Sequence, residues 1–380
     1  MSQGPLVKPF RALRFDEAKA GQLDQLVAPP YDVILPGELE QFVSRSPFNV
    51  VRLIRPHEPE LAANRLREWI EAGALVRESK PAIWRIEEEY VGPEGVPRTR
   101  RGLVARIRLR PYDHRVVVPH ERVFAGPAES RLRLLRATRA KLSPVLLLHP
   151  GESPLPVERA PDLEATLQGT TTRLWSETEP DTMEALIRTV QAPLVIADGH
   201  HRYEAALRFH EEEGAEETGW LMAALVSLDD PGLTIFPTHR VVTGPVPELN
   251  GGFRMSPVDG GAAEAVERLE RAARDRPAFV LLERDGAVLV EQSVVPAKPL
   301  ERLDVSAVDA LPLSGVTYTP HLREAQAAVE NGRARAAFLV RAPTVADVQE
   351  IARAGLTMPE KSTYFHPKLT SGLLFSPFDE

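Results

Sequence analysis

The chain has 380 residues, of which 43% are hydrophobic and 26% charged, and its 46 basic and 54 acidic side chains leave a formal net charge of −8. This composition is typical of a folded globular protein of two or three domains and argues against a disordered or fibrous chain. The negative charge disfavours a nucleic-acid partner, and the absence of cysteine excludes disulfides, thiolate nucleophiles and Cys-ligated metal sites.

Neither a membrane span nor a secretion signal is expected. No apolar run approaches the roughly 18 residues that a membrane span needs, and the N-terminal stretch MSQGPLVKPFRALRF has no apolar core behind a basic start. We therefore expect a cytoplasmic protein without a membrane partner.

Short apolar runs alternate with helical patterns along the chain, which predicts an α/β protein of the α+β type with mixed sheets. Three segments are expected, with boundaries at 1–111, 112–245 and 246–380. In the first segment the pattern predicts a strand at Val50–Arg55, a helix at Ala62–Val76, and strands at Ala82–Val91 and Leu103–Leu109.

The middle segment contains the best-defined elements. Leu194–Ile196 is a short apolar strand that enters the sequence ADGHHRYEAALRFHEEEG, where helical periodicity follows and Gly214 is a plausible helix end. A further strand pair is predicted at Met222–Leu228 and Leu233–Phe236.

The third segment combines three helical patterns with two strands and closes with the tail MPEKSTYFHPKLTSGLL. The predicted helices are Ala262–Arg274, His321–Asn331 and Val345–Ala354, and the predicted strands are Ala278–Leu282 and Ala337–Val340.

The strongest candidate site is Asp198-Gly199-His200-His201-Arg202, between the buried strand and the helix. The N–H groups of a first helical turn point out of the helix start, where the macrodipole favours an anion such as phosphate. Gly199 permits close backbone approach or a positive φ, Arg202 can fork onto phosphate oxygens, and Asp198 can hold Mg²⁺ or a hydroxyl. The simpler alternative is that Asp198 only caps the helix.

Glu204 follows His200 by four residues and His201 by three, so on a helix it shares a face with each of them. Asp198 and Glu204 are therefore candidate metal ligands. A metal-dependent hydrolase that uses these four side chains is a further alternative, although adjacent histidines on a helix point about 100° apart and seldom bind one ion.

Three other clusters carry polar side chains suited to chemistry. In Pro119-His120-Glu121-Arg122 a carboxylate beside a histidine can act as a general base, although such a glutamate is more often a surface group. Phosphate-competent donors also occur in Thr238-His239-Arg240 and in the tail, where either group could equally be a solvent-facing loop. The tail group is Lys361-Ser362-Thr363-Tyr364 with His366 and Lys368.

Several well-known sites are absent from the sequence. It contains no G-x-x-x-x-G-K-[ST] and no G-x-G-x-x-G, which disfavours Walker-type and Rossmann nucleotide sites. H-E-x-x-H and G-x-S-x-G are also missing, which disfavours a zincin metalloprotease and an α/β-hydrolase.

Seven motifs in chain order resemble a bacterial and archaeal family catalogued as domain-of-unknown-function family 1015. The motifs are PFRALRF, VAPPYDVI, PFNVVRLI, PHERVF, IADGHHRYEAAL, GLTIFPTHR and MPEKSTYFHPKLTSGLL.

The middle part is similar to the ParB/sulfiredoxin fold, whose members bind nucleotide phosphates at a G-x-[HR]-R turn, and to the free serine kinases of that fold, which pair Pro-His-Glu with D-G-H-x-R. This resemblance implies a ParB/sulfiredoxin-like central domain in which Glu121 deprotonates the acceptor hydroxyl. It also implies that the turn residues hold metal and phosphates, namely Asp198, His200, His201 and Arg202. The chain departs from the family pattern at Val123, which replaces a hydroxyl, and at Ser130, which replaces a carboxylate.

The sequence and the resemblance together lead us to expect a phosphotransferase that uses ATP or ADP with Mg²⁺ and acts on a small hydroxyl compound, with L-serine the best single guess. A ParB-type nucleotide switch without phosphoryl transfer is the main alternative. The expected catalytic residues are Glu121, His120 and Asp198. The expected nucleotide-binding residues are Gly199, His200, His201, Arg202, His239, Arg240, Lys361, Ser362 and Lys368.

Overall fold

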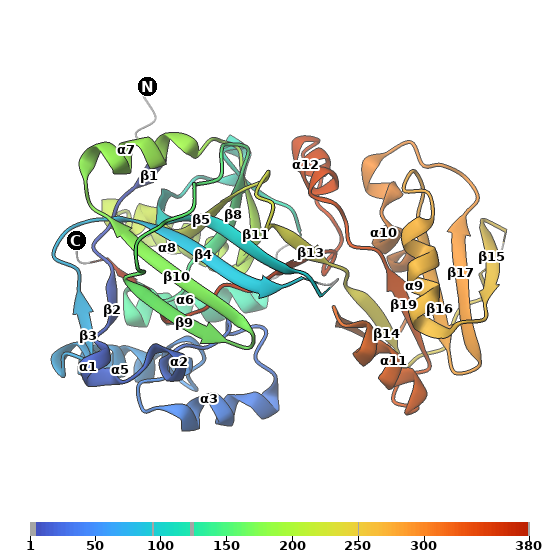
Figure 1. The fold of residues 1–380 in the computed structure, drawn as a ribbon, viewed down its shortest axis with the longest axis horizontal. Coiled ribbons are helices and arrows are strands. Elements are labelled where there is room, and N and C mark those ends of the chain that lie inside the picture. The colour runs from blue at the N-terminus through green and yellow to red at the C-terminus, as the bar shows by residue number, and fades with distance from the viewer. Residues whose placement is uncertain (1–4, 93–94, 122–124, 250, 379–380) are drawn as a thin grey trace. The chain divides into compact units, whose positions relative to one another are not determined.

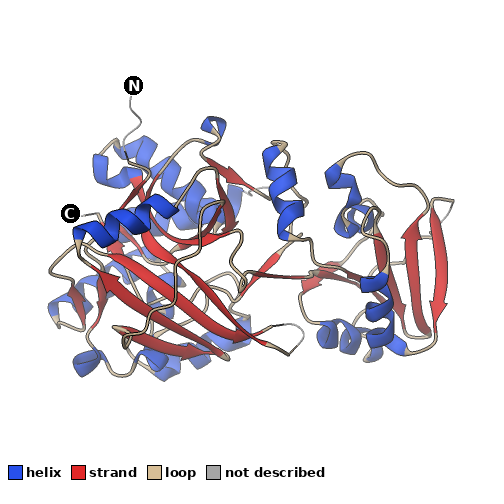
Figure 2. Cartoon of the chain, turned by 45° about the horizontal axis from the view of Figure 1, so that its top comes forward, coloured by secondary structure: helices blue, strands red, loops and turns tan. Residues whose placement is uncertain are grey.

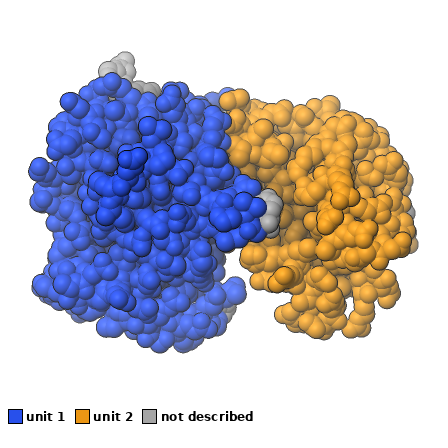
Figure 3. All heavy atoms as spheres, in the orientation of Figure 1, with its two compact units in different colours: residues 1–119, 123–234, 367–380 blue, residues 120–122, 235–366 orange. Residues whose placement is uncertain are grey.

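The computed structural model describes residues 5–92, 95–121, 125–249 and 251–378, which form a mixed α/β fold. The chain divides into two compact units (Figure 3). Unit 1 consists of residues 1–119, 123–234 and 367–380, and unit 2 consists of residues 120–122 and 235–366. The sequence of unit 2 is therefore largely inserted between two parts of unit 1.

Unit 1 is built on a nine-stranded mixed sheet (Figure 1) in the order β6-β11-β8-β12-β5-β4-β10-β9, with β1 also paired to β5. The pairs β6–β11 and β8–β12 are parallel and the others are antiparallel. The strands are β1 (Val7–Lys8), β4 (Ile83–Val91), β5 (Pro97–Arg108), β6 (Val117–Pro119), β8 (Val145–His149), β9 (Leu163–Leu167), β10 (Thr170–Glu177), β11 (Leu194–Asp198) and β12 (Trp220–Ser227). Two small sheets pair β2 (Leu13–Phe15) with β3 (Leu75–Arg77) and β7 (Ala140–Lys141) with β21 (Ser376–Pro377).

Burial distinguishes the centre of this sheet from its outer strands. Every residue of β8 and β12 is buried, as expected of strands that are covered on both faces. In β9, buried and exposed side chains alternate strictly, as in a strand with one face in solvent.

The helices of unit 1 flank these strands (Figure 2). The core combines side chains of α6 and α8 with the central strands, including Leu132, Tyr203 and Phe209 against Leu147 and Leu225. The helices are α1 (Glu17–Ala20), α2 (Leu23–Leu26), α3 (Leu39–Arg45), α4 (Val51–Ile54), α5 (Pro59–Glu71), α6 (Ala125–Thr138), α7 (Pro180–Thr189) and α8 (His200–Glu213), and the 3₁₀ turns are Pro36–Glu38, Tyr112–His114 and Glu216–Gly219.

Unit 2 contains a six-stranded antiparallel sheet in the order β15-β17-β16-β19-β14-β18. Its strands are β14 (His239–Val242), β15 (Phe253–Val258), β16 (Ala278–Glu283), β17 (Gly286–Gln292), β18 (Val316–Thr319) and β19 (Ala336–Val340). Its helices are α9 (Gly261–Arg271), α10 (Asp304–Asp309), α11 (Leu322–Glu330) and α12 (Val345–Arg353), with a 3₁₀ turn at Pro299–Arg302. A further pair joins β13 (Thr234–Phe236) to β20 (Tyr364–His366).

A buried ion pair stands at the centre of unit 2. Asp304 and Arg341 are 6% and 4% exposed, and the Asp304 carboxylate accepts from the Arg341 Nη2 at 2.7 Å and Nε at 2.8 Å. The same carboxylate accepts from the backbone N–H group of Ala278, the first residue of β16, and from that of Arg341, the residue that follows β19. One side chain therefore joins two strands of the sheet.

Most elements predicted from periodicity are confirmed with shifted ends. The predicted strands at 82–91, 103–109, 194–196, 278–282 and 337–340 correspond to β4, β5, β11, β16 and β19, and the predicted helices at 262–274, 321–331 and 345–354 correspond to α9, α11 and α12. The helix expected after Leu194–Ile196 is α8, which ends at Gly214 as predicted.

The predicted strand at Val50–Arg55 is wrong, because Val51–Ile54 is a helical turn, α4. The Asn49 side chain accepts from the Val51 N–H at 3.0 Å and donates to the carbonyls of Gln25 and Val27, which fixes the start of the turn. Val51, Leu53 and Ile54 are all buried, and a short buried apolar run has no periodicity that separates a strand from a helix.

In two further places the structure differs from the prediction, once in the extent of a helix and once in the pairing of two strands. The helix expected at 62–76 spans Pro59–Glu71 instead, because Gly73 takes a positive φ of 68° and the chain then enters β3. The strands expected to pair at 222–228 and 233–236 do form, as β12 and β13, but β12 pairs with β5 and β8 while β13 pairs with β20.

The three expected segments differ from the two compact units. The segments 1–111 and 112–245 contribute strands to a single sheet, since β5 of the first is hydrogen-bonded to β12 of the second. The last residues, 367–380, belong to unit 1 and not to the C-terminal segment that precedes them. Within the described residues no helix is both long and apolar enough to cross a bilayer.

We predict that Asp304→Ala lowers the free energy of unfolding of unit 2 by about 3–5 kcal/mol, because it leaves the Arg341 guanidinium buried without its counter-charge. Hydrogen exchange across β16 and β19, measured by mass spectrometry, reports this loss. The matched control is Glu301→Gln, which removes an exposed carboxylate paired with Lys298 and should change little. A loss below about 1 kcal/mol in Asp304→Ala would contradict the assignment.

Candidate functional site

The turn between β11 and α8, residues 198–202, has the geometry that the sequence predicts and is named the DGHHR turn here. Gly199 is the N-cap of α8 with φ 92° and ψ 27°, in the left-handed region that favours glycine. The amides of Arg202 and Tyr203 both donate to the Gly199 carbonyl, at 2.9 and 3.0 Å. The helix therefore starts directly after a buried strand, and the positive end of its dipole lies next to the carboxyl end of β11.

Two cations hold the Asp198 side chain. Lys368 Nζ lies 2.5 Å from Asp198 Oδ1, and Arg202 Nη2 lies 2.6 Å from Oδ2. Burial alone raises the pKa of the Asp198 carboxyl, but the charges of Lys368 and Arg202 outweigh burial and hold this pKa well below its ordinary value. Asp198 is thus an anion bound by two cations, and its side chain does not cap the helix.

Arg202 folds back over the turn. Its Nη1 donates to the Pro144 carbonyl, and a Cβ atom added at Gly199 would lie 2.9 Å from the Arg202 Nε and Nη2. Two features favour glycine at position 199: the backbone has a positive φ, and the Arg202 guanidinium occupies the space that a Cβ atom would need.

The two histidines occupy the first turn of α8. His200 and His201 are half-buried, and the charge of His200 contributes to the lowered pKa of Asp198. The structure thus brings together the predicted residues Asp198, Gly199, His200, His201 and Arg202 in one turn, and it adds Lys368 from the C-terminal tail.

The turn does not fit a metal ion held by the protein alone. Both Asp198 oxygens already accept from cations, so a divalent ion there would face the charges of Lys368 and Arg202. No group of three or more His, Asp or Glu suited to a metal occurs among the described residues, which include all four proposed hydrolase ligands. The four side chains of the alternative hydrolase site therefore do not form a ready metal cluster in this structure. Glu204 instead lies beside Tyr112, whose pKa is raised chiefly by burial and further by the Glu204 charge.

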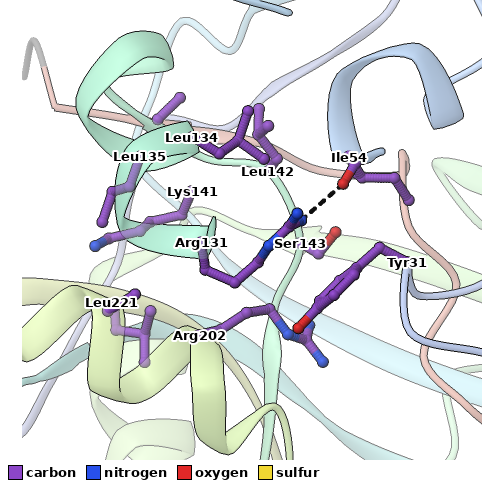
Figure 4. Close-up of a pocket in the computed structure, with 12 residues that line it drawn as sticks. Tyr31, Ile54, Arg131, Leu134, Leu135, Lys141, Leu142, Ser143, Arg202 and Leu221 are labelled. Atoms are coloured by element: carbon purple, nitrogen blue, oxygen red, sulfur yellow. Dashed lines mark hydrogen bonds between the residues drawn. The ribbon is translucent and has the colours of Figure 1, made fainter. Parts of the chain in front are cut away.

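A pocket of about 60 Å³ lies next to the DGHHR turn (Figure 4). Four polar residues line part of it, and apolar side chains of α4, α6, α8 and β12 line much of the rest. The polar members are Tyr31, Arg131, Ser143 and Arg202, and the apolar members include Ile54, Leu134, Leu135, Leu142, Ala205 and Leu221. Lys141 lines the pocket as well, but its ammonium points away from Arg131 and Tyr31 (Figure 4).

Sequence reasoning did not assign Tyr31 or Arg131 to a site. Tyr31 falls within the motif VAPPYDVI, and Arg131 directly follows Ser130, one of the two departures from the family pattern. The Arg131 guanidinium stacks on the Tyr31 ring, 3.9 Å from its centroid, and donates to the Ile54 carbonyl at 2.7 Å. The Ser130 hydroxyl accepts a 3.3 Å bond from Arg131.

His120 and Glu121 belong to unit 2 and share a threonine. Thr363 donates to Glu121 Oε1 through its amide at 3.2 Å and its hydroxyl at 3.1 Å, and His120 Nε2 lies 2.7 Å from the same hydroxyl. His120 Nε2 is 3.4 Å from Glu121 Oε1. His120 and Glu121 thus lie together at the Thr363 hydroxyl, which the sequence analysis had grouped with the tail donors and not with this pair. Arg122 and Val123 lie outside the described residues.

The remaining predicted nucleotide-binding residues have structural contacts inside unit 2. Burial lowers the pKa of His239 to about 4, and its Nδ1 accepts from the Val340 amide. Arg240 is fully buried, forms a two-bond pair with Asp309 and donates to the Lys361 carbonyl. Ser362 is buried and donates to the Pro359 carbonyl, whereas the Lys361 side chain is exposed. We assign His239, Arg240 and Ser362 a packing role.

Comparison with known proteins gives one family match. The family described as "Protein of unknown function (DUF1015)" matches residues 7–306. No curated protein is significantly similar to the chain.

Solved structures show a distant likeness. A conserved hypothetical protein from Pyrococcus furiosus is 18% identical, with 69% of this chain and 90% of that chain covered and a TM-score of 0.38. A free serine kinase in complex with AMP is 19% identical, with 69% and 86% covered and a TM-score of 0.38. SbnI from Staphylococcus aureus is 12% identical, with 72% and 87% covered and a TM-score of 0.37. Likenesses of this size transfer no activity.

We predict that Gly199→Ala is more destabilising than Gly214→Ala, although both glycines cap α8, one at each end, and both have a positive φ. At Gly214 an added Cβ meets nothing within 4 Å, so only backbone strain of about 1–2 kcal/mol is expected. At Gly199 the Cβ also displaces the Arg202 guanidinium from Asp198, which adds about 1.5–3 kcal/mol. Urea unfolding of the two variants measures the difference, and equal losses would show that Arg202 is not displaced.

We predict that Lys141→Met stabilises the protein near pH 6 and that this gain disappears towards pH 10. Burial, with a smaller contribution from the Arg106 charge, lowers the pKa of Lys141 from 10.5 to about 7. Between these values the unfolded chain binds more protons, so the stability of the parent protein rises with pH, and below pH 7 the full cost of about 5 kcal/mol remains.

Urea unfolding of the Lys141→Met variant and its parent between pH 6 and 10 measures this dependence. Lys298→Met, which removes an exposed ammonium, is the control and should show no such trend. A Lys141→Met variant that is less stable than the parent at pH 6 would refute the assignment.

Proposed function

The chain belongs to the DUF1015 family of proteins of unknown function, and we propose that it is a nucleotide-dependent phosphotransferase acting on a small hydroxyl compound, with L-serine as the preferred acceptor. The observation that supports this proposal best is the DGHHR turn. It combines a left-handed glycine, the N-terminus of a 14-residue helix and two cations within hydrogen-bond distance of one carboxylate.

A phosphate group at this turn would meet suitable partners. The N-terminal dipole of α8 attracts an anion, and the Arg202 guanidinium can take two phosphate oxygens at once. Lys368 adds a compact positive charge. In the absence of phosphate, Asp198 balances one of these two positive charges, so the turn keeps a positive charge with which an incoming phosphate can pair.

Phosphoryl transfer asks the protein mainly for positioning and charge neutralisation, which this turn can provide. Mg²⁺ would arrive with the nucleotide phosphates in such a reaction, since the protein alone does not offer a fitting ligand set. The nucleotide, ATP or ADP, supplies the phosphoryl group.

Glu121 is the proposed general base. The resemblance to free serine kinases assigns this role to the glutamate of Pro-His-Glu, and a base in this position would take the proton of the acceptor hydroxyl. Thr363 donates two hydrogen bonds to Oε1 and so restrains the orientation of the carboxylate. His120, whose ring meets the same hydroxyl, is a positioning residue in this proposal.

We predict that the purified protein, incubated with Mg²⁺, ATP or ADP and a panel of hydroxy acids that includes L-serine, forms a phosphorylated acceptor detectable by ³¹P NMR and mass spectrometry. Calorimetry should show binding of the nucleotide under the same conditions. Binding without turnover would favour the ParB-type switch, and absence of both would end the proposal.

Variants separate the two roles. Glu121→Gln should lower kcat by about 10²–10⁴-fold with nucleotide affinity retained, because it removes the base and keeps the shape. Arg202→Gln should instead weaken nucleotide binding. Glu350→Gln, an exposed carboxylate of the same unit, is the control and should behave as the parent. Equal activity of Glu121→Gln and Glu350→Gln would reject Glu121 as the base.

A further inference from the structure

We propose that the pocket next to the DGHHR turn binds the carboxylate of a small aliphatic acid, with Arg131, Arg202 and Tyr31 as its recognition group. This inference rests on the proposed function only where it identifies that acid with the phosphoryl acceptor. It gives the N-terminal part of the chain, which supplies Tyr31 and Ile54, a direct role in selecting the ligand.

The polar residues of the pocket lie together. In Figure 4 the guanidinium groups of Arg131 and Arg202 both lie close to Tyr31, and Arg131 stacks on the Tyr31 ring. Ser143 lines the same pocket. These side chains come from the loop before α3, from α6, from α8 and from the segment after β7. Four separate parts of unit 1 thus present donors to one small space.

Arg131 differs from Arg202 in having no carboxylate partner of its own in the part of the chain that the structure describes. No acidic side chain lies within ion-pair distance of Arg131 among the described residues, Asp32 acts on it only at longer range, and Arg202, which pairs with Asp198, repels it. Burial lowers the pKa of Arg131, and Arg202 lowers it further, so an added anion would relieve both effects.

Hydrogen-bond donors are also left over. The Nε atoms of Arg131 and Arg202 are buried and have no acceptor among the described residues. A buried donor without an acceptor is costly, and a ligand carboxylate would supply the missing acceptor to at least the Arg131 guanidinium.

Tyr31 fits the role of a neutral donor. Its pKa is raised chiefly by burial and then by the Asp32 charge, against the opposing effect of Arg131 and Arg202. The hydroxyl therefore stays protonated at neutral pH and can donate to a carboxylate oxygen.

The apolar lining favours a carboxylate over a phosphate. A pocket of about 60 Å³ has room for roughly four to six water molecules, which corresponds to a carboxylate with one or two carbons. The leucine and alanine side chains that line the rest of it can take such carbons but offer no donors to the further oxygens of a phosphate.

Binding of short carboxylates in the absence of nucleotide tests the proposal. Propionate and 3-hydroxypropionate, titrated into the full chain and followed by saturation-transfer difference NMR, should bind, and inorganic phosphate should compete with them poorly. Because phosphate can also bind at the DGHHR turn, competition is followed on the propionate signal: displacement of propionate by an equimolar amount of phosphate, or absence of propionate binding, would overturn the proposal.

The decisive variant is Arg131→Gln, with Arg136→Gln as its matched control. Both remove one positive charge from α6, but Arg136 is exposed and pairs with Glu212. Arg131→Gln should raise the Kd for propionate at least tenfold, and Arg136→Gln should leave it unchanged. If Arg131→Gln does not fold, Tyr31→Phe keeps the ring, removes the hydroxyl and should raise the Kd several-fold. An unchanged Kd in the folded variant would refute the assignment.

The same variants separate this inference from the proposed function. If phosphoryl transfer is found, Arg131→Gln should raise KM for L-serine much more than for ethanolamine, which lacks the carboxylate. Turnover with equal effects on both acceptors would refute the pocket assignment and keep the phosphotransferase. Carboxylate binding that depends on Arg131, without any turnover, would keep the pocket assignment and refute the phosphotransferase.

Discussion

The contact on which the candidate site depends is the pairing of the Asp198 carboxylate with Arg202 and Lys368. Arg202 lies four positions after Asp198 on the same turn, whereas Lys368 comes from the last part of the chain. One carboxylate therefore fixes the guanidinium over Gly199 and anchors the C-terminal tail at the start of α8. A change in this pairing would alter the orientation of Arg202, which is also part of the adjoining pocket.

The pocket shows how the N-terminal part of the chain is joined to the strand–turn–helix unit. Tyr31 stacks against Arg131 of α6, and Arg131 in turn donates to the end of α4. These contacts connect three sequence regions inside unit 1 and position two guanidinium groups in a space of low polarity. In such surroundings charge–charge and charge–dipole interactions are stronger than in water, so a small number of residues can select a ligand.

The strand, turn and helix around Asp198 could be predicted from the sequence because their signals are local. A buried strand, a glycine at each helix end and a run of polar residues between them are all visible within twenty positions. The contact with Lys368 could not be predicted, since it joins positions 170 apart and no sequence pattern relates them. The helical turn at α4 was missed because its short, uniformly buried run carries no period. Histidine and arginine at 239 and 240 have residue types typical of phosphate sites, but their surroundings commit them to packing.

The order of the units along the chain affects how the protein is made. Unit 2 comprises residues 120–122 and 235–366, and residues 367–380 of unit 1 are synthesised after it. During translation Asp198 can therefore pair with Arg202 well before Lys368, 170 positions later, has been added to the chain. The two ion pairs at the start of α8 form at different stages of synthesis, and the second of them closes unit 1 around the sequence of unit 2.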